Sequence, residues 1–332
     1  GVSLVRVVAE ARAAAGVKDA AGGHAAAARL GAGVMGLAAV GPRSEGDDMI
    51  VAIASGKGGT GKTTVAVNLV LSVPDAQYLD CDVEEPNGHL FLHPDLQTRH
   101  PVTVPLPQIN EQLCTRCGRC AEACEFNALA VTRQRVRVFP DLCHGCGVCS
   151  YVCPEPGAIT EIERRIGEVA VGRIPTGNGA GIGFVQGTLD VGEAVAVPVI
   201  KAVKRHADTR RTVILDAAPG TACPMVQTLR GADYCLLVTE PTPFGLNDLQ
   251  LAVGVARALG VPCGVVLNRC DIGDDAVAQY CRQERIPVLL EIPFEGELAV
   301  AYSQGIPWVQ ASPVYRERFQ ALHQAIRQEV AR

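Results

Sequence analysis

Short apolar runs recur along the chain after residue 48 and alternate with longer amphipathic stretches. Runs typical of buried strands, rich in Val, Leu and Ile, lie at residues 50–54, 212–215, 234–238, 265–267 and 288–290, and another short strand is predicted at 77–80. Helical stretches such as 246–259 and 274–284 separate them. Because strands that alternate with helices at this spacing form parallel sheets, we predict an α/β fold with a doubly wound, mostly parallel sheet.

This pattern breaks in two places, and each break marks a domain boundary. Residues 1–48 are rich in Ala and Gly, and a clean strand pattern starts only at Met49. We interpret them as a poorly ordered extension of uncertain origin, or as a short helical docking arm built from the Ala-rich stretches 5–15 and 20–30. A Cys-rich segment, residues 109–159, lacks long amphipathic helices. We predict that it is a small domain inserted into a larger one made of residues 49–108 and 160–332.

Composition and charge narrow the functional classes. The 332 residues carry a formal net charge of −5, and Lys and Arg are scattered along the chain, which argues against a nucleic-acid-binding protein. Charged residues interrupt every apolar run well before the roughly 20 residues that a membrane-spanning helix needs. We therefore expect a cytoplasmic protein without a transmembrane segment.

A glycine-rich loop follows the first predicted strand. It fits the pattern G-x-x-x-x-G-K-[ST] between an apolar strand and a helix, which is the context that this pattern requires. Glycines let backbone N–H groups converge on phosphates, and we expect Lys62 to reach the β and γ phosphates while Thr63 ligates Mg²⁺. The alternative is a glycine-rich turn with an incidental Lys-Thr pair. The predicted nucleotide-binding residues are Gly56, Lys57, Gly58, Gly59, Thr60, Gly61, Lys62, Thr63 and Thr64.

Three polar residues at the ends of predicted strands are further candidates. Asp82, Asp216 and Asn268 follow the strands at 77–80, 212–215 and 265–267. An isolated Asp or Asn at a strand end is usually a turn or helix-cap residue. In a chain with a phosphate loop, the same residues become candidates for nucleotide chemistry.

Eight cysteines form two runs with the spacing C-x2-C-x2-C-x3-C, which is the spacing of bacterial ferredoxins. Two copies in one chain are not plausibly accidental. In the ferredoxin pattern, three thiolates of each run surround one cluster and the fourth serves the other cluster. The pattern therefore implies one [4Fe–4S] cluster on Cys114, Cys117, Cys120 and Cys153, and a second on Cys143, Cys146, Cys149 and Cys124.

One residue departs from the ferredoxin pattern, and zinc remains an alternative to iron–sulfur clusters. Glu125 follows Cys124 where the pattern has Pro, although all eight ligands are present. Paired C-x2-C elements also bind zinc, which is the competing metal. Disulfides are not expected at this spacing.

These residues resemble those of the MinD/ParA/Mrp superfamily of P-loop ATPases, in particular the members with an inserted ferredoxin domain. The early Lys57 gives the loop Lys-Gly-Gly-Thr-Gly-Lys-Thr, which resembles the deviant Walker A loop of that class. The resemblance covers the chain from Met49 onward and leaves residues 1–48 unexplained. Besides the cysteine insert, it rests on segments 57–64, 80–87, 216–224, 239–245 and 266–269.

The resemblance implies an ATP-dependent homodimer in which Lys57 acts on the nucleotide of the partner subunit. Asp82 would orient the attacking water or accept its proton, and Asp216 would hold Mg²⁺ through water. Asn268 lies where the class places an adenine-reading Asn. The implied catalytic residues are Lys57, Lys62 and Asp82, and the implied cofactors are ATP, Mg²⁺ and two [4Fe–4S] clusters.

Cys223 raises a separate hypothesis. It lies seven residues after Asp216, the offset at which the nitrogenase iron protein, a member of the same class, carries a cluster-ligating Cys. A symmetric dimer could bring two Cys223 thiols together. Because the sequence shows neither the second cysteine of that ligand pair nor a C-terminal C-x-x-C like that of the Mrp carriers, we interpret Cys223 as an unliganded switch residue, with ligation as the alternative.

Three functions fit this reading of the sequence. The first is an ATPase whose nucleotide state gates electron transfer, or docking of a redox partner, by the two clusters. The second is a carrier that delivers clusters to an accepting protein. The third is a MinD-like positioning ATPase with structural clusters. In that case an apolar stripe near the C-terminus would contact a membrane, although such a stripe usually packs on a sheet. The stripe consists of Tyr315, Phe319, Leu322, Ile326 and Val330.

Overall fold

The computed structural model describes residues 49–176 and 181–332, so the expectations for residues 1–48 lie outside the described residues. The chain divides into two compact units. The larger unit spans residues 47–103 and 165–332, and the smaller unit includes residues 104–164. Both boundaries fall inside long strands, β3 (Asp95–Ile109) and β6 (Ile159–Ile174), which the sequence pattern did not predict.

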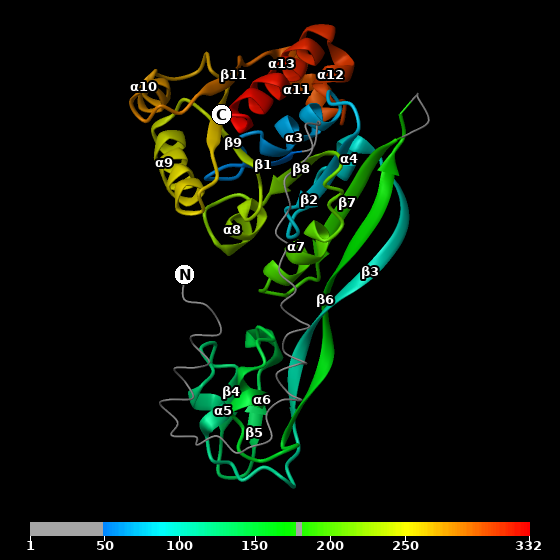
Figure 1. Ribbon diagram of the computed structural model, residues 1–332, viewed down its shortest axis with the longest axis vertical. Helices are drawn as coiled ribbons and strands as arrows, with labels where there is room; N and C mark the ends of the chain where they lie inside the picture. The colour runs from blue at the N-terminus through cyan, green and yellow to red at the C-terminus, as the bar shows by residue number, and fades with distance from the viewer. Residues whose placement is uncertain (1–48, 177–180) are drawn as a thin grey trace. The chain divides into compact units, whose positions relative to one another are not determined.

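A nine-stranded sheet in the order β11-β10-β9-β1-β8-β2-β7-β6-β3 organises the described part of the larger unit (Figure 1). The strands from β11 to β7 pair in parallel, and β6 pairs antiparallel to β7. The predicted doubly wound, mostly parallel α/β fold is confirmed. The parallel strands are β1 (Ile50–Ala54), β2 (Ala76–Cys81), β7 (Ile182–Leu189), β8 (Thr212–Ala217), β9 (Tyr234–Thr239), β10 (Cys263–Asn268) and β11 (Val288–Ile292).

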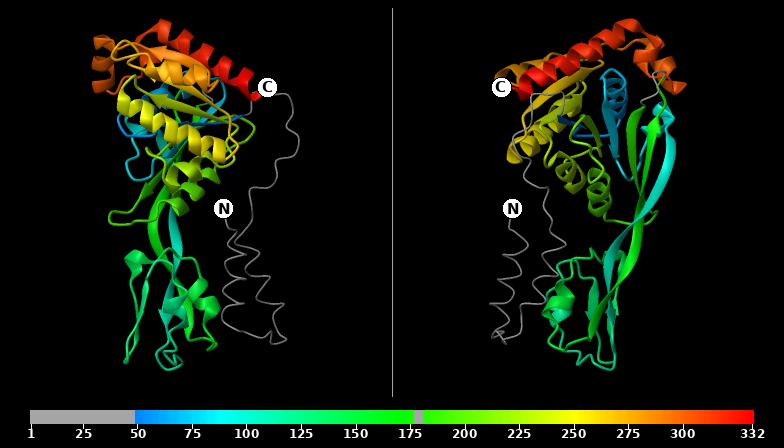
Figure 2. Two further views of the ribbon diagram at one scale, coloured as in Figure 1. Left: turned by 90° about the vertical axis from the view of Figure 1, so that its left-hand side faces the viewer. Right: turned by 45° about the vertical axis from the view of Figure 1, so that its right-hand side comes forward.

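Helices cover both faces of this sheet (Figure 1, Figure 2). On one face, apolar residues of α3 (Lys62–Val70), α12 (Trp308–Ala311) and α13 (Pro313–Val330) share one core with the strands. The other face carries α7 (Val197–Lys204), α8 (Cys223–Leu229) and α9 (Pro243–Ala258). Burial on both faces explains why every residue of β1, β2, β8 and β9 is buried and why most of them are apolar. The remaining helices are α4 (His89–Leu92), α10 (Ala276–Gln283) and α11 (Gly296–Ser303).

The C-terminal apolar stripe packs against the sheet and not against solvent. Tyr315, Phe319, Leu322 and Ile326 of α13 are each at most 3% exposed and belong to the main core, while Val330 at the helix end is 37% exposed. Four of the five stripe residues are therefore buried in the core and not available to a membrane. No helix among the described residues is long and apolar enough to cross a membrane.

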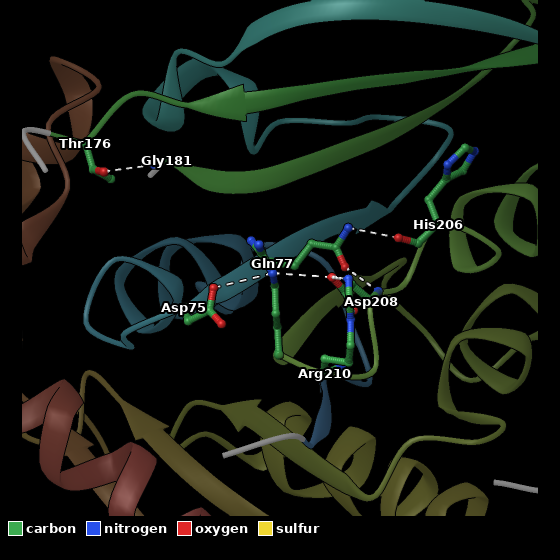
Figure 3. A network of polar contacts seen from close by, with 8 residues as sticks. Asp75, Gln77, Thr176, Gly181, His206, Asp208 and Arg210 are labelled. Atoms are coloured by element: carbon green, nitrogen blue, oxygen red, sulfur yellow. Dashed lines mark hydrogen bonds and ion pairs between the residues drawn. The ribbon is translucent and has the colours of Figure 1, made fainter. Parts of the chain in front are cut away.

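A polar network fixes the start of β2 to the loop before β8 (Figure 3). The Gln77 amide donates to the carbonyl oxygen of His206 over 2.9 Å and accepts from the Asp208 backbone N–H over 2.8 Å. Arg210 in turn holds the Asp208 carboxylate over 2.9 Å. Since β2 and β8 each carry a carboxylate at the opposite end, this network sets the register that brings those carboxylates together.

The smaller unit is built from short elements around the two cysteine runs (Figure 1). They are β4 (Leu129–Val131), β5 (Val136–Val138), α5 (Arg119–Glu122), α6 (Val148–Val152) and the short 3-10 helix η1 (Pro140–Leu142). β4 and β5 form an antiparallel hairpin. The core of the smaller unit contains Cys120 and Cys149 packed with Leu129 and Val136, so the cysteines themselves take the place of a larger apolar core.

Candidate nucleotide site and cysteine cavities

The phosphate loop connects β1 to α3 at the carboxyl end of the sheet. Parallel α/β sheets bind ligands at this end, where neighbouring strands lead their connections to opposite faces. Gly59 and Gly61 have φ values of 79° and 92°, which favour glycine. A Cβ at Gly56 would lie 2.3 Å from the Asp248 carbonyl oxygen on α9, so only glycine fits there. The loop therefore has the backbone shape that the sequence pattern predicted.

Lys62 lies at the centre of the site, at the start of α3. Its Nζ is 3.2 Å from Asp216 Oδ1 and 3.5 Å from Asp82 Oδ2, and only 7% of the side chain is exposed. Burial alone would lower the pKa of the ammonium, but the charges of Asp216 and Asp82 outweigh burial and raise the pKa above its ordinary value. Lys62 is therefore charged at neutral pH, as phosphate binding requires.

Asp82 follows β2 and lines the site. Burial raises the pKa of the Asp82 carboxyl to about 6, and the Lys62 ammonium limits the rise. The carboxylate form predominates at neutral pH, and its pKa lies close to the range in which a group accepts and returns protons efficiently. The structure thus brings Asp82, Asp216 and Lys62 together, as the sequence analysis expected of one nucleotide site.

Asp80 and Tyr78 support these carboxylates from β2, and the sequence analysis assigned neither of them a role. Asp80 is paired with Asp216 in the β2–β8 register and accepts backbone N–H groups of Asp82 and Gly88. Burial and the charge of Asp216 raise the pKa of Asp80 well above its ordinary range. The buried Tyr78 hydroxyl donates to Asp216 Oδ2 over 2.9 Å, which fixes the orientation of that carboxylate. No sequence motif marks Tyr78, because its partner lies 138 residues away.

Lys57, at the other end of the loop, has a different partner. Its Nζ is 3.7 Å from Glu240 Oε2 just after β9, and 33% of the side chain is exposed. The other oxygen of Glu240 is 2.8 Å from the Arg269 guanidinium. Lys57 is therefore held apart from the carboxylates that surround Lys62. Glu240 is a third residue to which the sequence analysis assigned no role.

A cavity of about 340 Å³ opens beside the loop, within the size range of small-molecule sites. Lys62, Thr63 and Asp82 line its polar part, and Phe294, Tyr302 and Trp308 line an apolar part. Asn268 also lines the cavity, and its amide donates to the Thr60 carbonyl oxygen over 2.8 Å. Other predicted residues on the wall are Gly58, Gly59, Gly61 and Thr64. Four predicted residues do not line the cavity: Gly56, Lys57, Thr60 and Asp216. Asp216 forms an ion pair with Lys62, which does line it.

Each of two small cavities in the smaller unit is lined by four cysteines. Cavity 1 is lined by Cys114, Cys117, Cys120 and Cys153. Cavity 2 is lined by Cys143, Cys146, Cys149 and Cys124. In each cavity three thiols come from one run and the fourth from the other run, which is the grouping that the ferredoxin spacing implies.

The two cysteine runs form an internal repeat. The backbone N–H of Asn110, four residues before the first run, donates to the Ala158 carbonyl oxygen after the second run over 2.9 Å. Reciprocally, the N–H of Phe139, four residues before the second run, donates to the Ala128 carbonyl oxygen over 2.8 Å. Each repeat therefore closes on the end of the other. This exchange explains why the fourth cysteine of each run lies at the opposite cavity.

The loops that carry the cysteines also match between the repeats. Arg116 and Gly145, at the same position in the two runs, both have positive φ, and so do Gly118 and Gly147. The Ala128 N–H donates to the Cys124 sulfur over 3.3 Å. Burial raises the pKa of the Cys149 thiol to about 11 and that of Cys120 above its ordinary value. A bound metal would offset this by holding the thiolate form.

Among the described residues, no group of three or more His, Cys, Asp or Glu side chains converges closely enough to hold a single metal ion. The thiols surround each cavity and do not meet at a point. The other cysteines are more ordinary. Cys235 is fully buried in β9, and Cys223 is exposed at the start of α8.

Comparison with known proteins identifies the larger unit. The profile of the CobQ/CobB/MinD/ParA nucleotide binding domain matches residues 51–308. The chain belongs to this nucleotide-binding family. An uncharacterised protein of Methanocaldococcus jannaschii is 30% identical over 263 residues, which cover 77% of this chain and 90% of that protein. The cell division ATPase MinD of Pyrococcus furiosus is 19% identical in structure-based alignment, with a TM-score of 0.48 over 85% of this chain and 99% of that chain.

One shorter match concerns an oxidoreductase. A ketoisovalerate oxidoreductase subunit of Methanothermobacter marburgensis is 38% identical over 66 residues, which cover 18% of this chain and 84% of that subunit. The CobQ/CobB/MinD/ParA assignment therefore accounts for most of the chain, and a separate likeness to an oxidoreductase subunit concerns a short part of it.

Proposed function

We propose that this chain hydrolyses Mg·ATP, carries two [4Fe–4S] clusters, and uses the nucleotide state of a homodimer to gate electron transfer or partner docking at those clusters. The observation that carries the proposal is the grouping of eight cysteines into two sets of four, in a chain that also holds the phosphate loop and charged Lys62. The short likeness to a ketoisovalerate oxidoreductase subunit supports a redox role.

The two cysteine sets fit clusters better than single zinc ions. A zinc site brings four ligands to one point, whereas a [4Fe–4S] cluster takes one thiolate on each of four irons. The cysteines of each set lie around a cavity, in line with the second arrangement. When bound, each cluster would supply one-electron redox chemistry, with Cys114, Cys117, Cys120 and Cys153 holding cluster 1 and Cys143, Cys146, Cys149 and Cys124 holding cluster 2.

At the nucleotide site, the described residues suggest a division of labour. Lys62 would bind the terminal phosphates, and Thr63 and Asp216 would hold Mg²⁺. Because Lys62 is paired with Asp82 and Asp216 in this structure, an incoming phosphate would compete with both carboxylates for the ammonium. Asp82 would then be free to accept a hydrogen bond from the attacking water. Tyr78 would keep Asp216 in place during the exchange.

Lys57 would couple hydrolysis to dimerisation. Its partial exposure and its separation from Lys62 leave it available to reach the nucleotide of a second copy, as the family resemblance implies. Release from Glu240 would accompany that movement. The dimer, the role of Lys57 in trans and the gating of the clusters are parts of one proposal and stand on the same test.

An anaerobic redox titration followed by EPR, on protein with counted iron, tests the proposal. We expect about eight irons per chain and a change of reduction potential or line shape when Mg·ATP is added. A Lys62→Ala variant serves as the control, because it keeps the cysteines and should lose the response to nucleotide. Full iron content without any nucleotide response would overturn the gating mechanism. Rapid transfer of clusters to an apo-ferredoxin would instead identify a cluster carrier.

A further inference from the structure

Exposed arginines concentrate on the first repeat of the smaller unit, around cavity 1. Arg116 and Arg119 lie between cysteines of the first run, and the other three lie on the hairpin formed by β4 and β5. We call these five side chains the arginine face: Arg116, Arg119, Arg133, Arg135 and Arg137. None of them forms an ion pair with a carboxylate in the part of the chain that the structure describes. Their charges are therefore available to a partner.

The hairpin is fixed to the loop that carries the cluster 1 cysteines. The Arg116 guanidinium donates to the Gln134 carbonyl oxygen at the hairpin tip over 3.3 Å. Val136 of β5 is buried and lines cavity 1. Because side chains alternate along a strand, Arg137 points to solvent from the strand that places Val136 at the cavity, and Arg135, directly before that strand, is also exposed. The hydrogen bond of Arg116 and the packing of Val136 therefore fix the arginine face beside cavity 1.

Cavity 2 provides an internal comparison. Its loop has the same backbone turns but carries His144, Gly145, Gly147 and Val148 between the cysteines. Residues 139–164 contain four carboxylates and one Arg, whereas residues 110–138 contain five Arg against three Glu. Glu161 lines cavity 2, while cavity 1 is lined by both Arg116 and Glu155. The repeats therefore share ligand geometry and differ in charge, a formal +2 against −3.

The charge of the whole chain indicates what kind of partner fits. Because the chain carries a net −5, an acidic protein is repelled by the chain as a whole, whereas the unpaired positive charges of the arginine face would attract it. Cys117 is exposed and lies next to Arg116, so a bound partner would reach the edge of cluster 1. We propose that the arginine face docks an acidic one-electron carrier protein and that cluster 1 exchanges electrons with it. This inference rests on the proposed presence of clusters.

The exchange moves a single electron. The reduced carrier would give up one electron to the cluster held by Cys114, Cys117, Cys120 and Cys153, with no bond made or broken. Positive charges favour the more negative state of a cluster, so the arginine face would raise the reduction potential of cluster 1. The charge asymmetry thus assigns electron entry or exit to cluster 1.

Flavodoxin, an acidic flavoprotein, is the probe. Binding of oxidised flavodoxin to the full, cluster-loaded chain is measured by calorimetry, and electron transfer from reduced flavodoxin is followed by stopped-flow absorbance of the flavin. Both are measured between about 10 mM and about 100 mM salt, where the screening length falls from about 30 Å to about 10 Å. The test variant carries Arg133→Gln, Arg135→Gln and Arg137→Gln. The matched control carries Arg205→Gln, Arg282→Gln and Arg285→Gln, three exposed arginines of the larger unit.

We expect binding and transfer by the unaltered chain to weaken as salt rises. At low salt the test variant should lose at least about tenfold in both, and the control should match the unaltered chain. Salt-independent binding of flavodoxin by a chain with reducible clusters would overturn the docking proposal alone. Binding of single-stranded RNA at these arginines, without salt-dependent binding of flavodoxin, would overturn it as well. Absence of reducible clusters would overturn the proposed function, and the binding measurement with oxidised flavodoxin does not depend on them.

Discussion

At the scale of single residues, the nucleotide site is defined by one ammonium and the carboxylates around it. Lys62 lies within 3.5 Å of oxygens from both Asp82 and Asp216, and Tyr78 holds Asp216 from the side. A buried charge is tolerated only where partners of opposite charge surround it. The charges of the site are therefore balanced before any ligand binds. Phosphate and magnesium would exchange the ion-pair partners of Lys62, Asp82 and Asp216.

Replacing Lys62 tests this balance directly. Lys62→Ala should weaken ATP binding on the order of 10- to 100-fold, because charge-assisted hydrogen bonds contribute about 1.5–3 kcal/mol. Iron content should stay unchanged, since no cysteine set contacts Lys62. Calorimetric titration with Mg·ATP and iron counting measure both. Lys201→Ala, which removes an exposed lysine of α7, is the control. Loss of iron together with nucleotide binding would show that the two chemistries are not separable.

The pKa of Asp82 gives a pH dependence with a definite sign. In the proposed role, the carboxyl would act on the attacking water only when deprotonated, and its pKa is raised to about 6. The kcat/KM for ATP hydrolysis, which reports groups of the free enzyme, should therefore be constant near neutral pH and fall about tenfold per pH unit below about 6. Asp82→Asn should remove this fall of kcat/KM at low pH, together with most of the activity. An unchanged profile in that variant would assign the fall to another group.

The residues that the sequence did not reveal have a common feature. Asp82, Asp216 and Asn268 stand at strand ends, where a motif can mark them, and the structure brings them to one site. Tyr78 and Glu240 act through partners 138 residues and more than 180 residues away. Such pairs arise from the register of β2 with β8 and from the position of β1 beside β9. Sequence separation hides them, because nothing local distinguishes a buried Tyr in a strand from an ordinary core residue.

At the scale of elements, the phosphate loop is shaped by its packing on α9. Gly56→Ala would place a Cβ 2.3 Å from the Asp248 backbone oxygen, which no side-chain rotation relieves. We expect a loss of about 1–3 kcal/mol in the free energy of unfolding, as for other overpacked sites. Gly58→Ala is the matched control, since its Cβ would meet open space. Thermal unfolding without nucleotide separates the two variants, and equal melting temperatures would contradict this account.

Element prediction succeeded where burial produced a clear pattern. Six of the seven parallel strands that the structure describes, and α9, α10 and α13, could be predicted because apolar side chains mark their buried faces, whereas β7 was not predicted. β3 and β6 could not, because much of each strand is exposed on both faces. β3 also contains Pro101, Pro105 and Pro107, which normally argue against a strand. An edge strand has one partner only, so it tolerates the prolines that a central strand would reject.

At the scale of the whole molecule, the chain combines two units with separate cores. The larger core is aliphatic and spans the sheet, whereas the smaller one is built around cysteines. Each unit should therefore respond to its own substitutions. The sequence indicated both chemistries, since each depends on a local motif, but not the course of β3 and β6, which carry the chain from one unit to the other.

Loss of one cluster should leave the nucleotide site intact. Cys120→Ser removes a ligand of cavity 1, and we expect iron to fall from about eight to about four per chain. ATP affinity should change by less than about twofold, because the larger unit keeps its own core. Iron counting and calorimetry on the same preparation measure both quantities. Cys235→Ser, a change at a buried cysteine outside both sets, is the control for general effects of the substitution.

In the proposed homodimer, Glu240 would set part of the free-energy cost of assembling two copies. In a dimer that uses Lys57 in trans, each subunit must give up one ion pair before it gains a contact across the interface. Because Arg269 keeps its 2.8 Å contact with Glu240, the departure of Lys57 leaves no carboxylate uncompensated. A partly exposed pair such as Lys57–Glu240 contributes about 1 kcal/mol or less. The Lys57–Glu240 pair would therefore hold back the proposed assembly only weakly, and a nucleotide that binds the dimer better by a modest factor would be enough to offset its loss.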